Sequence, residues 1–366
     1  MANSITNRQM FYVLIMTLTT YTSIDLPKLV AEKAGRSGWL LVLAVAFLFG
    51  GAAILVTKLN NRFPGMVLYD YSREIAGRFV SLVIIIYYIL YFLTVGVYLK
   101  VKLVDFLSAS FLPKTPQFLM LLIAVALFAY VSYKGVTNFA RVLELFGIVF
   151  LVTTMTICVI MLFQGMIYNI RPFWNPNEIK FFPGTVPYLF FPFGGVEVLL
   201  IVPFTKRNRK APLVSFLTML FIGLFYALII EGTICILGIN NTILYNDSLI
   251  EAIKIVYIPI IERTDIFYLT VGLSGLFAGM IMVFLSILEF ICRLFARANR
   301  AVVTLAVAVV LYVLCLVGLG IPNITDTLNE IAPYLVVASS FVIPALLLLV
   351  AVIRKKRAAG RTEDDA

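Results

Sequence analysis

The most informative stretch for the fold of this 366-residue chain is Pro192-Phe193-Gly194-Gly195-Val196-Glu197, which lies inside a long apolar segment. A proline followed by adjacent glycines disfavours a continuous helix, because proline removes a backbone donor and glycine is a poor helix former. The carboxylate of Glu197 follows directly, and an ionisable group at membrane depth is costly and marks a functional candidate. The stretch therefore predicts a broken helix that lines a cavity. The alternative is a kinked helix in which Glu197 is a buried structural partner.

The segment around this stretch is one of many apolar segments. Hydrophobic residues make up 62% of the chain and charged residues 13%, which is more apolar surface than a water-soluble fold of this size hides. The composition predicts an all-α polytopic membrane protein, formed as a single transmembrane domain over residues 1–366. About 20 apolar residues cross the bilayer core, so we expect ten transmembrane helices. Their cores are residues 10–30, 39–56, 80–101, 118–131, 143–163, 185–204, 214–237, 266–290, 301–318 and 334–353.

The basic residues give the ten helices a direction. If the N-terminus is cytoplasmic, roughly two thirds of the 29 Lys and Arg residues fall on the cytoplasmic side, as the positive-inside rule requires. Both termini are then cytoplasmic, and residues 355–366 form a cytoplasmic tail. Splitting ten helices into five and five predicts two inverted repeats, residues 8–163 and 184–354, because an odd number of spans reverses the direction of entry. We expect the apolar faces of these helices to contact the lipid bilayer.

The first span of repeat one corresponds to the broken span of repeat two. It has no central glycine, but it carries the hydroxyl-rich run Thr17 to Ser23. Such hydroxyls offer hydrogen bonds that compete with the helical backbone, so we expect helix 1 as well as helix 6 to be discontinuous. Paired breaks at the midplane of inverted repeats are a common substrate site in transporters. The alternative is an ordinary helix whose hydroxyls bond back to it.

The candidate ligand-binding residues follow from these two breaks. Residues from the first span contact one end of a small polar ligand and the opened backbone of the sixth span contacts the other, while Glu197 pairs with a cation or orients the unwound segment. Tyr98, which shares a face of the third span with Tyr91, is a candidate wall residue. The full set is Thr20, Tyr21, Thr22, Ser23, Tyr98, Phe193, Gly194, Gly195 and Glu197.

Other chemistry is disfavoured. The chain has no histidine, and its four cysteines are dispersed with no CxxC pair, so we expect no metal, no cofactor and no enzyme activity. The basic residues are spread between apolar spans and form no nucleic-acid face. Residues 164–184 and 238–263 are long connections that are interpreted as lids, partner surfaces or plain covering loops.

Several stretches together resemble the spore germination permease family, the B-type membrane subunits of nutrient germinant receptors, within the amino acid/polyamine/organocation transporter superfamily. The stretches are Ser23-Ile24-Asp25-Leu26-Pro27, Gly38-Trp39, Phe111-Leu112-Pro113-Lys114-Thr115-Pro116, Phe193-Gly194-Gly195-Val196-Glu197-Val198-Leu199-Leu200 and Glu262-Arg263-Thr264-Asp265-Ile266-Phe267. The resemblance covers nearly the whole chain.

The resemblance implies a LeuT-like fold with a site between helices 1, 3, 6 and 8. It implies residence in the inner membrane of the bacterial spore, beside an A-type membrane subunit and a C-type lipoprotein. The ligand is then a small germinant, often an amino acid. Where the family commonly has Gly-x-Gly in helix 1, this chain has Thr20-Tyr21-Thr22, which narrows the approach of a carboxylate to the backbone and leaves a sugar or a nucleoside open.

Three functions remain open from the sequence. The leading hypothesis is a ligand-sensing, permease-like receptor subunit. The second is a secondary transporter of amino acids coupled to an ion or a proton, with Glu197 or Glu231 as the proton carrier. The third is a structural subunit with a vestigial cavity that only assembles the complex.

Overall fold

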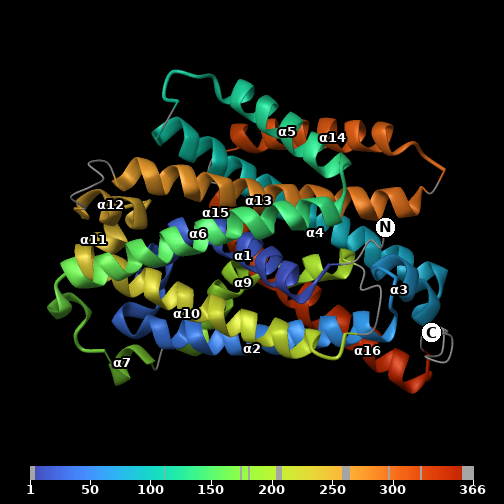
Figure 1. Ribbon diagram of the computed structural model, residues 1–366, viewed down its shortest axis with the longest axis horizontal. Coiled ribbons are helices and arrows are strands. Elements are labelled where there is room, and N and C mark those ends of the chain that lie inside the picture. Colours follow the sequence, from blue (N-terminus) through green and yellow to red (C-terminus); the bar gives the residue numbers. More distant parts are fainter. Residues whose placement is uncertain are drawn as a thin grey trace.

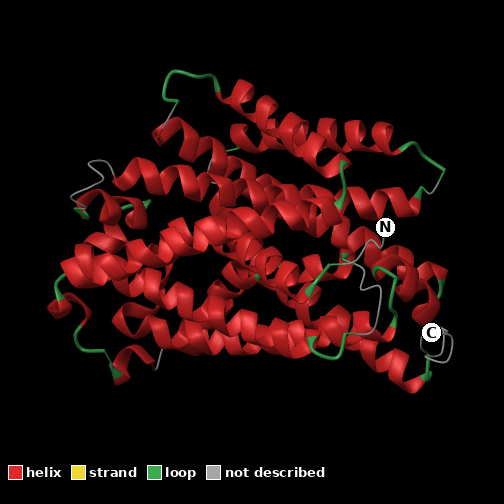
Figure 2. Ribbon diagram, viewed as in Figure 1, coloured by secondary structure: helices red, strands yellow, loops and turns green. Residues whose placement is uncertain are grey.

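The structure is a computed structural model, and it describes residues 5–110, 112–173, 175–179, 182–202, 208–257, 264–295, 297–321 and 324–356. Within these ranges every regular element is a helix (Figure 2). The long helices are α1 (Asn7–Ala34), α2 (Gly38–Arg62), α4 (Arg78–Ser110), α5 (Gln117–Tyr133), α6 (Val136–Gln164), α10 (Ala211–Leu237), α13 (Thr264–Leu294) and α14 (Arg300–Gly320).

Shorter pieces complete the bundle. They are η1 (Gly35–Ser37), α3 (Leu68–Ala76), η2 (Ile167–Ile170), α7 (Pro176–Ile179), α8 (Phe182–Thr185), η3 (Val186–Leu189), α9 (Phe190–Phe193), η4 (Val196–Ile201), α11 (Ile239–Leu244) and α12 (Ser248–Ile255). The chain ends with α15 (Ile324–Val337), the π-helical turn η5 (Ala338–Val342) and α16 (Ile343–Ile353).

Eight stretches of the described residues are long and apolar enough to cross a membrane. They are Asp25–Arg62, Arg78–Ser108, Val136–Gln164, Phe182–Ile201, Ala211–Leu237, Val271–Leu294, Arg300–Gly320 and Glu330–Ile353. The apolar α5 is shorter, at 17 residues. The predicted all-helical membrane architecture is confirmed, whereas the count of ten spans and the inverted repeats stay predictions.

The expected break in the first span is wrong. The backbone of α1 is one helix from Asn7 to Ala34, with Pro27 inside it. One hydroxyl of the predicted break bonds back to the helix, since Thr19 Oγ1 donates to the carbonyl of Ile15 at 2.6 Å. This back-bonding satisfies a hydroxyl within the helix and leaves the helical backbone bonds in place.

Close approach of helix backbones holds the middle of the bundle together. α10 packs along α2, and a Cβ atom added at Gly223 of α10 would lie 2.3 Å from the Cβ atom of Ala46. One turn of α2 further on, a Cβ atom at Gly50 would lie 2.6 Å from the ring of Phe216. Inside lipid no hydrophobic driving force brings helices together, so they associate through close van der Waals packing, which small residues at such crossings allow.

The two ends of the bundle carry different elements (Figure 1). α3 and the end of α16 lie at one end, which we call the α3 face, and α7, α11 and α12 lie at the opposite end, which we call the α11–α12 face. The long helices connect these faces. The broken segment α8 to η4 lies between them, where it is surrounded by α1, α2, α13 and α15.

Candidate functional site

The predicted break in the sixth span is confirmed. Phe182–Ile201 is built from four short helical pieces, and the chain leaves α9 at Gly194 with φ −63° and ψ 140°. Gly195 follows with φ +130°, a conformation that residues with a Cβ atom rarely adopt. A Cβ atom there would also lie 3.2 Å from Leu18 of α1, so the missing side chain of Gly195 allows the opened backbone to pack against α1.

The carboxylate of Glu197 is fully buried and accepts hydrogen bonds from three segments. Its Oε2 atom accepts the backbone N–H of Gly195 at 2.6 Å. Its Oε1 atom accepts the hydroxyls of Ser339 at 2.6 Å, of Ser340, and of Tyr91 at 3.3 Å. A carboxylate satisfied by this many donors orients the unwound segment, which is one of the two roles the sequence predicted for it.

A tyrosine from α10 supports the other side of the break. The hydroxyl of Tyr226 donates to the carbonyls of Leu18 at 2.6 Å and of Pro192 at 3.1 Å. Its ring packs edge-on against Phe193, with 5.2 Å between centroids. Tyr226 thereby joins α1, the broken segment and α10 at one buried point, and it satisfies a carbonyl that the interrupted helix leaves without its regular partner.

A narrow cavity lies beside the break. Its volume is about 10 Å³, room for roughly one water molecule. Most of its wall is apolar, and its polar groups are the hydroxyls of Thr17 and Tyr91 and the backbone of the two glycines. The lining residues are Thr17, Tyr91, Phe92, Val95, Leu99, Gly194, Gly195, Val198, Gly279 and Val283.

Thr17 is the polar side chain of this wall that has a free hydrogen-bonding group. The residue is 4% exposed, and its Oγ1 atom has no hydrogen-bond partner among the residues that the structure describes. A buried hydroxyl without a partner costs about 1–3 kcal/mol relative to a bonded one. A ligand that supplies this partner would recover that cost.

The structure brings only part of the predicted site together. Gly194 and Gly195 line the cavity, and Glu197 accepts the backbone N–H of Gly195. Phe193 points away from the cavity wall and stacks on Phe49, with 5.7 Å between ring centroids. Tyr98 is buried but packs edge-on against Phe191 at 4.8 Å, and it is not among the lining residues.

The four predicted residues of the first span cannot be placed against this wall. Thr20, Tyr21, Thr22 and Ser23 lie in α1, and their side chains fall outside the described part of the structure. Several site residues lie outside the predicted set. Thr17 lies one helical turn before this run, Tyr91 lies in α4, and Ser339 and Ser340 lie in the last span. A serine pair four to five residues before Pro344 was the available signal, because proline at that spacing disrupts the helix around the serines.

A second buried charge lies away from the cavity. Lys100 of α4 is fully buried, and its Nζ atom has no hydrogen-bond partner within the described ranges. Its Nζ atom lies over the ring of Phe128 of α5, 6.0 Å from the centroid. Lys100 is not a cavity-lining residue, so it is not part of the candidate site. The described residues also contain no group of three or more metal-ligating side chains.

Polar contacts close the bundle at the α11–α12 face. Lys102 of α4 pairs with Asp25 of α1 at 2.7 Å, and Lys28 donates to Asn246 at 2.7 Å in the connection between α11 and α12. Burial raises the pKa of the nearby Asp247 carboxyl, and Asp25 raises it further. The long connection after α10 therefore covers the end of α1, as a lid would.

The connection after α6 is fastened to the turn between α1 and α2. The side chain of Glu178 accepts the backbone N–H of Ser37 at 2.8 Å, and the hydroxyl of Ser37 accepts the backbone N–H of Asn175 at 3.0 Å. Trp39 donates through its indole N–H to the carbonyl of Phe173 at 3.2 Å. This segment also forms part of the cover at the α11–α12 face.

Other polar contacts close the α3 face. Asn61, near the end of α2, exchanges two hydrogen bonds with the backbone of Asn208, at 2.8 and 3.0 Å. The side chain of Asn208 donates to Asn7, the first residue of α1. Arg8 pairs with Glu144 of α6 at 2.9 Å. Side-chain contacts thus join the ends of several helices at both faces of the described bundle.

A helical bundle of apolar candidate spans, one of them broken around a buried carboxylate beside a cavity, is the architecture of an integral membrane protein of the permease kind. The chain belongs to the spore germination protein family, since the sequence model of that family matches residues 4–353.

Known relatives agree with this assignment. The chain is 24% identical to spore germination protein YndE of Bacillus subtilis (strain 168) over 97% of its own length and 98% of that protein. It is 25% identical to spore germination protein B2 of the same organism over 76% of each chain, and 24% identical to spore germination protein KB over 96% of this chain and 95% of the relative. The resemblance drawn from the sequence is confirmed.

Proposed function

We propose that this chain is a B-type, permease-like subunit of a spore germinant receptor and that it binds a small nutrient in the cavity beside the broken segment. The observation that carries the proposal is the buried, unpartnered hydroxyl of Thr17 opposite the opened backbone of Gly194 and Gly195. A polar group without a partner among the described residues, on the wall of a cavity, is what a polar ligand would satisfy.

The wall favours a compact ligand with one polar end and a short apolar part. The polar groups Thr17 and Tyr91 face a wall of Val95, Leu99 and Val283. An amino acid fits this division better than a sugar or a nucleoside, whose polar groups are distributed around the molecule. The N–H of Gly195 is already bonded to Glu197, so a ligand carboxylate would have to displace that carboxylate.

In this proposal the chain binds and does not catalyse. Both termini are cytoplasmic, the α3 face is the cytoplasmic face, and the protein lies in the inner membrane of the spore beside an A-type subunit and a C-type lipoprotein. The cavity holds about one water molecule, so binding must expand it. Expansion shifts the protein from the closed arrangement to another, and partner subunits respond to that shift.

The test is a ligand screen by thermal stability of the purified protein. Amino acids, sugars and nucleosides are added one at a time, and a ligand that binds only the folded protein raises the unfolding temperature. The stabilisation by a hit should require roughly tenfold more ligand in Thr17→Val and be unchanged in Thr233→Val, whose hydroxyl bonds within its own helix at 2.8 Å. Stabilisation that survives Thr17→Val unchanged contradicts the site. Cavity variants that leave nutrient response intact would favour the structural-subunit hypothesis.

A second candidate function is transport of the same ligand, with an amino acid carried by coupling to an ion or a proton. The observation in its favour is that partly exposed ion pairs join the helices at each face of the bundle, where alternating access requires contacts that can open. Uptake of a labelled hit into proteoliposomes decides between the two. Accumulation driven by an ion gradient supports transport, and binding without accumulation supports sensing.

A further inference from the structure

The last long helix contains a π-helical turn at the level of Glu197. The backbone N–H of Ile343 donates to the carbonyl of Ala338, five residues earlier, instead of to Ser339. Pro344 comes next and has no N–H for the carbonyl of Ser340. Two consecutive carbonyls therefore lose their regular helical donors, and single π turns of this kind are frequent at functional sites.

Side chains from two other segments stabilise this turn. The hydroxyl of Tyr88 of α4 donates to the freed carbonyl of Ser339 at 2.6 Å. The hydroxyls of Ser339 and Ser340 both donate to Glu197. The turn is thus kept in its π form by the carboxylate that also holds the break through the N–H of Gly195.

Residues at the C-terminal end of α16 form hydrogen bonds to α3. Arg354 donates to the carbonyl of Ile75 at 2.8 Å, and Lys356 donates to the carbonyl of Glu74. Both acceptors lie in the last turn of α3, where helix carbonyls lack intrahelical partners. Arg62 at the end of α2 adds a bond to the carbonyl of Ala351 at 2.9 Å.

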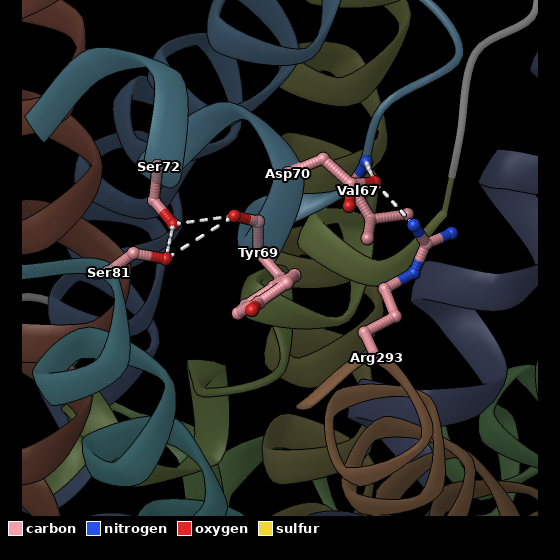
Figure 3. A network of polar contacts seen from close by, with 6 residues as sticks. All are labelled: Val67, Tyr69, Asp70, Ser72, Ser81 and Arg293. Carbon is pink, nitrogen blue, oxygen red and sulfur yellow. Dashed lines mark hydrogen bonds and ion pairs between the residues drawn. The ribbon is translucent and has the colours of Figure 1, made fainter. Parts of the chain in front are cut away.

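α3 is in turn attached to two helices of the bundle (Figure 3). Asp70 of α3 pairs with Arg293 near the end of α13. Ser72 of α3 bonds to Ser81 of α4 at 2.7 Å, and both hydroxyls lie near the carbonyl of Tyr69. A change at the end of α16 therefore acts on the element that ties α13 and α4 together at the α3 face.

We propose that α15, η5 and α16 transmit the state of the broken segment to α3, with the π turn as the two-state element. When Glu197 releases the serines, the turn converts to α-helix and the N–H of Ile343 bonds to Ser339 in place of Tyr88. The π turn contains one residue more than an α-helical turn, so its conversion shifts the register by one residue and rotates α16 by roughly 100° relative to α15. The rotation withdraws Arg354 and Lys356 from the last turn of α3.

This inference rests on the proposed function only in that nutrient binding is what releases the serines. The connection itself is a property of the chain and is testable without a ligand. The conversion changes the donor to one carbonyl: Tyr88 bonds the carbonyl of Ser339 in the π form, and the N–H of Ile343 bonds it in the α-helical form. Removing the hydroxyl of Tyr88 takes a stabilising bond from the π form and therefore favours the α-helical form.

The experiment measures cross-linking between α3 and the end of α16. Cysteines replace Glu74 and Lys356 in full-length protein whose four native cysteines are changed to alanine, and the rate of cross-linking by a short bifunctional maleimide is followed. Tyr88→Phe and Glu197→Ala should each lower the rate at least threefold. The matched controls are Tyr312→Phe, whose exposed hydroxyl donates to the carbonyl of Phe118 at 3.4 Å, and Ser286→Ala, whose hydroxyl bonds within α13.

A reciprocal measurement separates transmission from loss of stability. Coupling between two sites is mutual, so Arg354→Ala should change the rate at which a maleimide labels a cysteine placed at Thr17. Rates that stay equal in Tyr88→Phe, the controls and the unmodified pair overturn the proposal, even if Glu197→Ala fails to fold. If the cross-linking responds and the nutrient screen finds no ligand, the proposed function fails and the transmission path stands.

Discussion

The hydroxyl of Ser339 donates to the carboxylate of Glu197 at 2.6 Å, across 142 residues of sequence. This bond joins the break in one span to the π turn in another. Each irregularity leaves backbone groups without regular helical partners at membrane depth, where unsatisfied groups are costly. Glu197 is the shared acceptor of the N–H of Gly195 and of both serine hydroxyls, while Tyr88 bonds the freed carbonyl of Ser339. The cavity lies beside the break.

Replacing Glu197 tests how much the hydrogen bonds that it accepts contribute to stability. Glu197→Ala leaves three hydroxyls and one backbone N–H without their acceptor, so we expect a loss of about 3 kcal/mol or more in the free energy of unfolding. Glu197→Gln keeps one acceptor oxygen and should lose about 1–2 kcal/mol. Denaturant titration of the detergent-solubilised protein measures both. Glu251→Gln, on the exposed side of α12, should change little, and an equally small effect at Glu197 would show that the network is dispensable.

A methyl group at Gly194 tests how tightly the broken segment packs. The added Cβ atom would lie 2.9 Å from Val336 of α15 and 3.3 Å from the hydroxyl of Tyr91. The backbone at Gly194 suits alanine, so steric overlap is the cause of any effect, and we expect a loss of about 1–3 kcal/mol. Gly184→Ala is the matched control, since nothing lies within 4 Å of its added Cβ atom. Equal melting temperatures for the two variants would contradict this packing.

The sequence predicted the break in the sixth span because its cause is local. Prolines remove donors and Gly195 supplies a positive φ, and neither effect depends on the neighbours. The same reasoning failed for α1, where hydroxyl residues only compete with the helix. That competition was decided within the helix, as the bond from Thr19 to Ile15 shows.

The partners of Glu197 could not be predicted, because they depend on tertiary contacts. Ser339 and Ser340 are ordinary residues of an apolar span, and Tyr91 was only one of several tyrosines in its helix. Tyr98 illustrates the same limit: it shares a helix face with Tyr91, yet Phe191 of α9 covers it while Tyr91 reaches the cavity. Spacing gives the face of a helix, and only packing decides which residue of that face meets the site.

The ion pair between Asp70 and Arg293 should contribute little to stability. Both side chains are about one third exposed, so Asp70→Asn should cost at most about 1 kcal/mol. The loss should shrink at high salt, because exposed charges are screened. Thermal unfolding at low and high ionic strength measures this, with Lys254→Ala as the control for an exposed pair within one helix. A loss that is large and independent of salt would mean that the pair is not solvated.

The pKa of Asp247 predicts a pH dependence. Burial, Asp25 and Glu251 raise this pKa above its ordinary value, although Lys102 and Lys254 oppose the rise. The folded protein therefore holds this proton more tightly than the unfolded chain. Protonated Asp247 stabilises the folded state at low pH, and this stabilisation is lost as the pH rises through the raised pKa. Asp247→Asn should remove that loss. The variant's melting temperature relative to the unmodified protein should be higher at pH 7 than at pH 4, and a difference that falls between pH 4 and pH 7 would contradict the raised value.

Nutrient binding at the break is tested most sharply by the nutrient dose response of spores that carry Thr17→Val. The substitution keeps the shape of the side chain and removes the one cavity hydroxyl that has no partner among the described residues. Loss of one hydrogen bond to a ligand should raise the half-maximal nutrient concentration by roughly tenfold. Thr233→Val spores, with the same chemical change in a buried helix position outside the cavity, should respond like the unmodified strain. An unchanged dose response in Thr17→Val spores that contain normal amounts of the protein would contradict nutrient binding at the break.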